Sequence, residues 1–372
     1  MAGSAPMGRR AALRCGAAGA LALALGTPAP AAGAPATGRR RARPDPVRWS
    51  SPLPDGPVEC GVALGHGAVY AVTGSQLTAV EVASGAPRWR ADLPAVRRSY
   101  ATLLTARDHV VAGVADWITP SQVRYQTAAR RPGDGAPGWE STSFCPRAVH
   151  GDALVAEFRP TRSRRDVGGF AAATGALRWR LARTGIGETD VTDGQPDRLV
   201  AHAPLAGEGS WVLLDALTGD VRWRRPLRGV AAATADTGDG LIVMVQNESR
   251  FLQRINAAAG TPDWVVSVPD AWALRLSATD AVVATAAGAV TAHDLRTGAP
   301  RWTWTPPATV RQPRLRVSGA RVYLDGGDVG WLLDAATGAL IGPPVVDLGW
   351  PAMDDSTLYG VNAGRLVALA LP

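Results

Sequence analysis

The chain has 372 residues, of which 46% are hydrophobic and 19% charged, and its formal net charge is +7. All 39 basic residues are arginines, which excludes chemistry that needs a lysine, such as a P-loop phosphate site or a Schiff base. Beyond the N-terminus, no apolar run approaches the roughly 18 residues of a membrane span, so we expect a soluble globular body.

Residues 1–34 have the features of an export signal. Arg9 and Arg10 precede an apolar stretch over 11–25, and small residues at 29–31 offer cleavage sites. The arginine pair resembles the twin-arginine export motif, and an ordinary Sec signal is the alternative. Removing this segment takes away three arginines and no acidic residue, which leaves a net charge of +4. The sequence therefore predicts a protein that is secreted or resides in the cell envelope, with no transmembrane anchor after signal cleavage.

Residues 35–46 form a leader rich in proline, alanine and arginine, which we interpret as a solvated tether. Its arginines stand at 39, 40, 41 and 43. The remaining body is close to neutral, so electrostatic attraction gives no reason to expect nucleic-acid binding.

From residue 47 onward, one string of residues recurs along the chain. In its clearest copy, AHDLRTGAPRW over 292–302, it has the form A-x-D-x-x-T-G-x-x-x-W. Less complete copies end at tryptophans 89, 139, 179, 223 and 264, and successive tryptophans are 38 to 50 residues apart. A last copy has kept Thr337 and Gly338 but lost its tryptophan, whereas Trp49 has no motif before it. Such a period is typical of repeat architectures.

Each repeat predicts four short strands. In DGLIVMVQNESRFLQRINAAAGTPDWVVSVP, over 239–269, an apolar β-branched run, a polar loop, a second alternating run, a glycine turn and a tryptophan-bearing strand follow one another. A further short run precedes the first. Four antiparallel strands at a period near forty residues are typical of a propeller blade.

The two ends of the repeat region complement each other, because the C-terminal repeat lacks its fourth strand and the N-terminus supplies one strand with Trp49. We therefore predict an all-β fold over 47–372. It is an eight-bladed β-propeller of four-stranded antiparallel blades, closed by pairing the N-terminal strand with the C-terminal blade. Seven of the 13 tryptophans would lie flat against the next blade, beside a glycine with positive φ.

The recurring string resembles the tryptophan-docking motif of PQQ-like β-propeller repeats, the family that holds quinoprotein dehydrogenases and BamB-like outer-membrane assembly factors. The dehydrogenases bind PQQ and Ca²⁺ beneath a vicinal disulfide, using Glu, Asn and Asp. This sequence has no adjacent cysteines and only seven Glu. We therefore expect no cofactor and no enzyme activity, although one propeller serves many functions.

Metal and nucleophile motifs are not evident. The five histidines, at 66, 109, 150, 202 and 293, lack metal-ligand spacing. The loop that holds Asp236 and Asp239 is read as a β-turn rather than as a calcium loop. No catalytic and no metal-binding residue is predicted.

A candidate partner-binding face is predicted at the connections between the second and third strands and between blades. Aromatic residues and arginines together are typical interface anchors. Capping of the blade cores is the alternative role for these side chains. The candidates are Arg97, Arg98, Tyr100, Trp117, Arg162, Arg164, Arg165, Trp272 and Trp350.

These observations favour an exported, non-enzymatic and monomeric scaffold that binds a protein or an envelope component. A quinoprotein-type enzyme and a sensor domain are the alternatives. In the mature chain, Cys60 and Cys145 fall at equivalent places two blades apart, so we expect two thiols rather than a disulfide.

Overall fold

The computed structural model describes residues 47–55, 61–94, 101–119, 122–161, 164–182, 188–190, 198–204, 209–226, 230–246, 250–310, 313–327, 329–346, 348 and 351–372. The predicted signal peptide and leader lie outside these residues, so both stay predictions. None of the described segments forms a helix with the length and apolarity that crossing a membrane requires.

All regular structure in the described residues is β-strand. The first half holds β1 (Val47–Pro52), β2 (Ala63–Gly65), β3 (Ala68–Thr73), β4 (Gln76–Glu81), β5 (Pro87–Asp92), β6 (Ala101–Ala106), β7 (His109–Thr119), β8 (Gln122–Arg130), β9 (Pro137–Ser141), β10 (Cys145–His150), β11 (Ala153–Thr161), β12 (Arg164–Ala171), β13 (Leu177–Ala182), β14 (Glu188–Asp190), β15 (Arg198–Pro204) and β16 (Gly209–Asp215).

The second half continues in the same way. It holds β17 (Val221–Pro226), β18 (Val230–Asp236), β19 (Gly240–Gln246), β20 (Phe251–Asn256), β21 (Pro262–Ser267), β22 (Ala271–Leu276), β23 (Asp280–Thr285), β24 (Val290–Asp294), β25 (Pro300–Trp304), β26 (Arg314–Ser318), β27 (Arg321–Asp325), β28 (Val329–Asp334), β29 (Val345–Val346), β30 (Ala352–Met353), β31 (Thr357–Asn362) and β32 (Arg365–Ala370).

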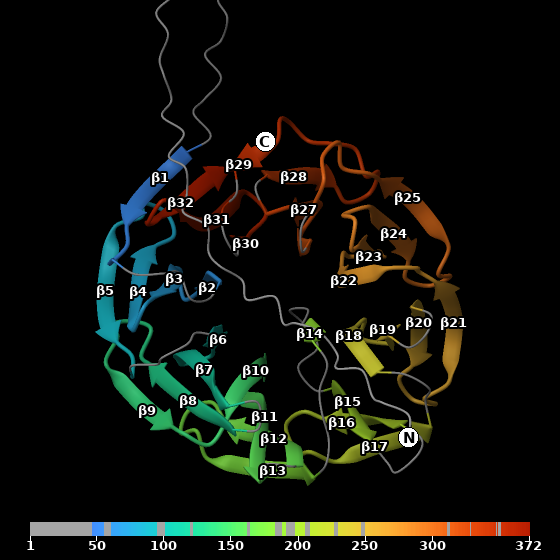
Figure 1. Cartoon of the computed structure of the whole chain (residues 1–372), viewed down its shortest axis with the longest axis horizontal. Helices are drawn as coiled ribbons and strands as arrows, with labels where there is room; N and C mark the ends of the chain where they lie inside the picture. Colours follow the sequence, from blue (N-terminus) through green and yellow to red (C-terminus); the bar gives the residue numbers. More distant parts are fainter. Residues whose placement is uncertain are drawn as a thin grey trace, which may run out of the picture. The chain divides into compact units, whose positions relative to one another are not determined.

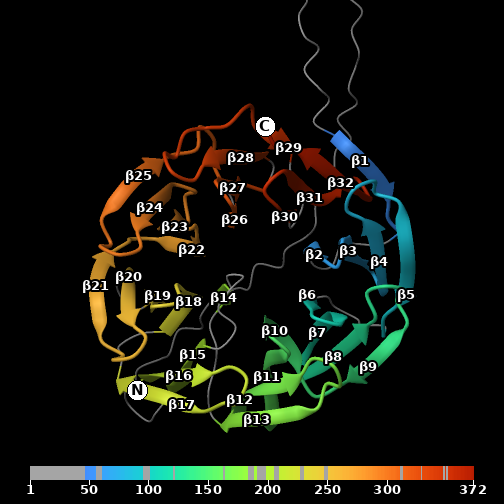
Figure 2. The ribbon, with the colours of Figure 1, turned by 180° about the vertical axis from the view of Figure 1, so that it is seen from behind.

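Within the unit Asp45–Pro372, these strands form blades arranged around a ring, with the first strand of each blade innermost (Figures 1 and 2). The second strands are mostly buried, and β3 is buried along its whole length, because a blade packs against neighbours on both sides. This double burial explains the continuous apolar runs at these positions. The fold is an all-β propeller of four-stranded antiparallel blades, as the sequence predicts.

The count of complete blades differs from the predicted eight. Seven sheets of the described residues contain four successive antiparallel strands, whereas β15, β16 and β17 form a three-stranded sheet. The short strand β14, which the repeat would place on β15, instead runs parallel to β18 in the following blade, where Glu188 lies opposite Ala233. An extra strand can satisfy its backbone groups on either neighbour, and a run of three residues is too short for the sequence pattern to decide which.

The ring closes as the sequence predicts. Strand β1 pairs antiparallel with β32, so that Ser50 lies opposite Val367. Arg365 adds hydrogen bonds from its guanidinium to the Ser50 hydroxyl, at 2.6 Å, and to the Ser50 carbonyl, at 3.0 Å. This pairing supplies the outermost strand of the last blade from the beginning of the repeat region.

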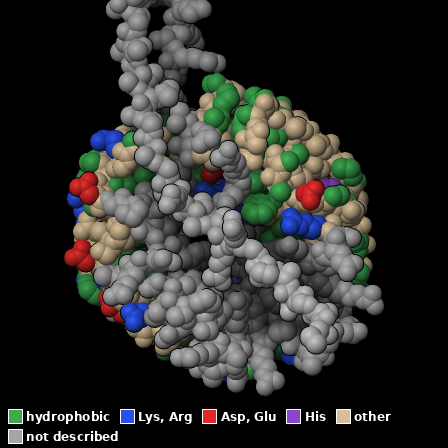
Figure 3. All heavy atoms as spheres, in the orientation of Figure 1, with side chains coloured by type: hydrophobic (Ala, Val, Ile, Leu, Met, Phe, Trp, Pro, Cys, Tyr) green, Lys and Arg blue, Asp and Glu red, His purple; other side chains and the backbone are tan. Residues whose placement is uncertain are grey.

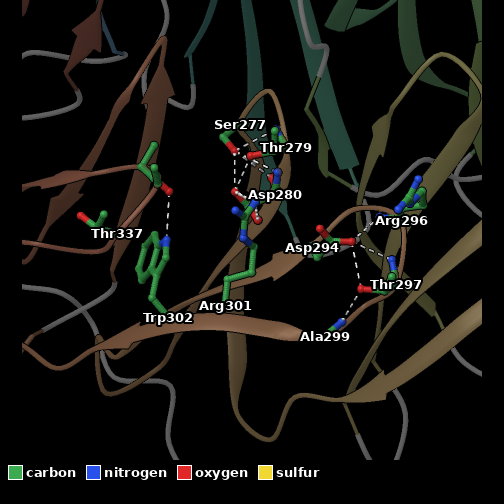
Figure 4. A network of polar contacts seen from close by, with 12 residues as sticks. Ser277, Thr279, Asp280, Asp294, Arg296, Thr297, Ala299, Arg301, Trp302 and Thr337 are labelled. Atoms are coloured by element: carbon green, nitrogen blue, oxygen red, sulfur yellow. Dashed lines mark hydrogen bonds and ion pairs between the residues drawn. The ribbon is translucent and has the colours of Figure 1, made fainter.

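The recurring tryptophans hold successive blades together, as predicted. In each case the indole Nε1 donates to a carbonyl oxygen of the next blade, as Trp302 does to Ala335 at 2.9 Å (Figure 4). The indole also covers the glycine of the next docking turn, where an added Cβ would come within 3 Å of the ring. The seven tryptophans are Trp49, Trp89, Trp139, Trp179, Trp223, Trp264 and Trp302.

The Asp and Thr of the string close the turn between the third and fourth strands. The Asp294 carboxylate accepts hydrogen bonds from the Thr297 hydroxyl and from the backbone N–H groups of Thr297 and Arg296, all within 3.0 Å (Figure 4). These bonds, that of the Thr297 hydroxyl first, lower the pKa of Asp294. Gly298 follows with φ at 73°, a conformation that favours glycine. One segment therefore forms a local turn and also supplies the tryptophan that contacts the next blade.

Candidate partner-binding face

The candidate site lies on the connection face, which we define as the loops between second and third strands together with the blade-to-blade connections. Successive strands of a blade alternate in direction, so the docking turns lie on the opposite face. Loop 286–289 and connection 268–270 belong to the connection face. The connection face therefore does not contain the docking turns of the repeated string.

Most of the nine predicted residues cannot be placed as side chains. Five of them, Arg97, Arg98, Tyr100, Arg162 and Trp350, lie outside the described residues. Trp117 lies in β7, and Arg164 and Arg165 lie in β12, where only the backbone is described. Trp272, in β22, is the one candidate whose side chain is described.

The backbone places Trp117, Arg164 and Arg165 on two long hairpins of neighbouring blades. Strands β7 and β8 have 11 and 9 residues and β11 and β12 have 9 and 8, against 5 to 7 for the second and third strands of the other blades. Trp117 lies opposite Val123, and Arg164 opposite Thr161, both close to the hairpin ends. The β15–β17 and β18–β21 sheets separate these hairpins from Trp272, so the nine residues do not form one continuous patch (Figure 1).

Trp272 projects from the innermost strand of its blade. The pairing of β22 with β23 shifts in register between Ala271 and Ala273, which marks a β-bulge at Trp272. A bulge takes a side chain out of the regular alternation and redirects it. The Trp272 side chain is 47% exposed, so it does not cap the blade core.

The backbone around Trp272 is held by several hydrogen bonds. The Arg250 guanidinium from the preceding blade donates to the Ala271 carbonyl oxygen. The Ala271 N–H donates to the Val268 carbonyl at 3.1 Å, and the Ala286 N–H donates to the Asp270 carbonyl at 2.8 Å. Asp270 has a φ of 58°, which is costly for a residue other than glycine, although Asp tolerates it better than most. The aromatic ring therefore starts from a fixed backbone.

Sequence reasoning missed the contributions of Arg250 and Asp270. Arg250 ends a polar loop of the preceding blade, and its contact with Ala271 depends on how the two blades pack. The one available signal for Asp270 was its place between Pro269 and an innermost strand, a position typical of a turn. The two connections beside Trp272 contain four exposed residues, Pro269, Asp270, Ala286 and Ala287.

The described charges do not gather into a single patch in the view of Figure 3, where acidic and basic side chains appear at separate points of the surface. Many arginines on the opposite face and along the blades are paired instead. Arg178 pairs with Asp152 at 2.5 Å, and Arg301 pairs with the buried Asp280 at 3.2 Å (Figure 4). Charge distribution alone therefore does not single out a binding site.

His66, His293 and the Asp236–Asp239 segment are part of local turn structure. His66 lies in a turn with φ at 53°, and the Nδ1 atom of the buried His293 is 3.1 Å from the Gly298 carbonyl oxygen. The Thr237 N–H donates to the Gly240 carbonyl at 2.9 Å, so this loop is a turn, as predicted. Across the described residues, no three His, Cys, Asp or Glu side chains gather in a way that would hold a metal ion.

Antiparallel blades around a ring, joined by seven docked tryptophans, define a PQQ-like β-propeller. The family model described as "Outer membrane protein assembly factor BamB" matches residues 163–370, and the chain belongs to this family. A search among curated proteins found no match.

Solved structures extend this similarity to nearly the whole propeller. BamB from Moraxella catarrhalis is 16% identical, with 87% of this chain and 99% of that chain covered and a TM-score of 0.64. The computationally designed protein Ika8 is 14% identical, with the same coverage and a TM-score of 0.63. Quinohemoprotein alcohol dehydrogenase from Comamonas testosteroni is 13% identical over 84% of this chain and 66% of that chain, with a TM-score of 0.51. At these identities the likeness concerns the fold.

Proposed function

We propose that this chain is an exported, non-enzymatic β-propeller that binds a protein partner in the cell envelope through its connection face. The observation that carries the proposal is Trp272, a large aromatic side chain that is 47% exposed on a bulge of an innermost strand. Leaving such a side chain in water is unfavourable, and exposed aromatic anchors are typical of binding surfaces. Membership of the BamB family supports a protein as the partner.

Three finer features belong to the same proposal. The sheet of β15, β16 and β17 is the eighth blade of the ring, and β14 is its displaced innermost strand. The segment 1–34 directs export, and the mature protein is a monomer without a cofactor. The remaining connection-face candidates, among them Trp117 and Arg164, form a second part of the binding surface on the two long hairpins, separate from Trp272.

Capture experiments with matched variants test the proposal. The mature protein would be immobilised and exposed to an envelope extract, and the captured proteins would be quantified for wild type, Trp272→Ala and Val265→Ala. Val265 is a suitable control because it is 55% exposed on the outermost strand β21, outside the loops that define the connection face. We expect at least one protein to be lost with Trp272→Ala and retained with Val265→Ala. Equal capture by all three forms would contradict the proposed face.

Enzyme activity is tested separately. The purified mature protein would be incubated with PQQ and Ca²⁺, and its absorbance and its reduction of an artificial electron acceptor would be measured with alcohol substrates. We expect no bound quinone absorbance and no reduction of the acceptor. If the protein with bound PQQ and Ca²⁺ reduces the acceptor, it is a quinoprotein-type dehydrogenase and the proposed scaffold function is wrong.

A further inference from the structure

We infer that Asp270 and Trp272 together bind a cationic side chain, the ammonium of a lysine or the guanidinium of an arginine, on the partner protein. This inference deepens the proposed function and rests on it, because it names the chemistry that the connection face recognises. It depends on two neighbouring residues that are exposed and have no side-chain partner among the residues that the structure describes.

The Asp270 carboxylate differs from several other described turn carboxylates, which have partners. Asp294 accepts hydrogen bonds from Thr297, Asp152 pairs with Arg178, and Asp239 pairs with Arg254. Asp270 is exposed, and its carboxylate has neither a hydrogen bond nor an ion pair within the described part of the chain. Among the described residues, this negative charge is unpaired, and it lies directly before the innermost strand β22.

Trp272 differs from the other described tryptophans in the same way. Seven donate their indole N–H to the next blade, Trp304 and Trp331 contact each other, and Trp211 is fully buried. The Trp272 indole has no hydrogen bond or ring contact among the described residues and is 47% exposed. Nearly half of Trp272 is therefore accessible to a ligand.

The two residues are close along the chain, and the backbone between them is held in place. They are two residues apart, so their Cα atoms lie within about 7 Å of each other. The peptide between them is fixed by the Arg250 guanidinium on the Ala271 carbonyl and by the Ala286 N–H on the Asp270 carbonyl. A residue with positive φ outside glycine is often retained at a functional position. Preorganisation of this kind reduces the entropy lost on binding.

A carboxylate beside an aromatic ring selects a cation for physical reasons. The negative face of an indole attracts Lys or Arg within about 6 Å of its centre. The carboxylate adds a Coulomb attraction and accepts the N–H groups of the same cation. An anionic side chain would be repelled by Asp270, and a neutral aliphatic one would gain only the apolar contact. The recognised feature is therefore a basic side chain on the partner.

Indole NMR resonances can report on this site directly. The ¹⁵N-labelled mature protein would be titrated with N-acetyl-lysinamide, with N-acetyl-argininamide and with N-acetyl-norleucinamide, which keeps the apolar chain without the charge. The Trp272 resonance is the one that disappears in Trp272→Phe. We expect the two cationic probes to shift this resonance, the norleucine probe to have little effect, and the Asp270→Asn variant to bind the cations about two- to fivefold more weakly.

The expected outcome includes weaker binding of the cationic probes at high ionic strength, because salt screens an exposed charge pair. Equal shifts with norleucinamide, or unchanged lysinamide binding by Asp270→Asn, would overturn the cation site. Asn tolerates positive φ, so this variant keeps the backbone, and its melting temperature verifies that it is folded. If Trp272→Ala loses a captured protein but Asp270→Asn does not, the proposed function stands and the cation site fails.

Discussion

The indole Nε1 of Trp302 lies 2.9 Å from the carbonyl oxygen of Ala335, which belongs to the next blade. The same ring covers Gly338 of the following docking turn, whose added Cβ would lie 2.5 Å from the indole. One side chain thus satisfies a buried carbonyl and seals a turn at once. The repeated string is easily recognised in the sequence because its Asp, Thr and Gly form the docking turn, and its Trp covers the docking turn of the next blade.

Trp302→Ala should lower the free energy of unfolding by about 3 kcal/mol, because it removes a large packed side chain and leaves the Ala335 carbonyl without its donor. Trp272→Ala should change stability by less than about 0.5 kcal/mol, as expected for an exposed site. Urea unfolding of both variants measures the difference. Equal losses would mean that Trp272 contributes to the core.

Gly338→Ala should cost more stability than Gly364→Ala. Both glycines have similar φ angles, 70° and 72°, so both substitutions carry a backbone cost of about 1 kcal/mol. A Cβ at Gly338 would also clash with Trp302, whereas a Cβ at Gly364 would meet nothing within 4 Å. Thermal unfolding of the pair separates the two contributions. Equal shifts would show that the indole moves aside without cost.

Acid should destabilise the protein through its docking-turn carboxylates. Hydrogen bonds from the Thr297 and Thr337 hydroxyls, followed by backbone N–H groups, lower the folded-state pKa of Asp294 and Asp334. A lowered folded pKa stabilises the fold above the unfolded pKa of about 3.9, and this stability is lost as pH falls through the folded pKa. The Asp294→Asn, Asp334→Asn double variant should show a flatter decline in unfolding free energy below about pH 4. The same decline in wild type and variant would contradict this origin.

Thiol counting should find two thiols in the denatured, non-reduced mature protein. Cys145 is buried in β10, and Cys60 lies outside the described residues just before β2. The β6–β9 blade stands between β2 and β10, and a disulfide requires Cα atoms within about 7 Å. A count of zero would mean that the chain before β2 reaches across a whole blade.

Export should depend on the arginine pair at the N-terminus if the twin-arginine route is used. The double variant Arg9→Lys, Arg10→Lys keeps the charge but removes the pair that the export receptor reads. We expect it to remain inside the cell, while wild type is recovered outside the cytoplasm by fractionation. Normal export of the variant would assign the signal to the Sec route.

The repeat, the all-β class and the role of the docking tryptophans could all be predicted from the amino-acid sequence. These features are local or periodic: an Asp and a Thr close one turn, a glycine takes positive φ, and a tryptophan follows four residues later. Each copy repeats the same physical requirement, so the pattern remains readable after the rest of the repeat has diverged. The closure of β1 on β32 also followed, because an unpaired strand at each end favours pairing between them.

How neighbouring blades meet could not be predicted from the sequence, because it depends on their packing in the folded protein. The pairing of β14 with β18, the contact of Arg250 with Ala271 and the bulge that exposes Trp272 join segments whose relation depends on the packing of adjacent blades. No local propensity specifies such contacts, because a short strand or a long side chain has several partners of similar energy within reach. The candidate site consists of these contacts, which is why the sequence predicts Trp272 as a candidate but not Asp270 as its neighbour in the site.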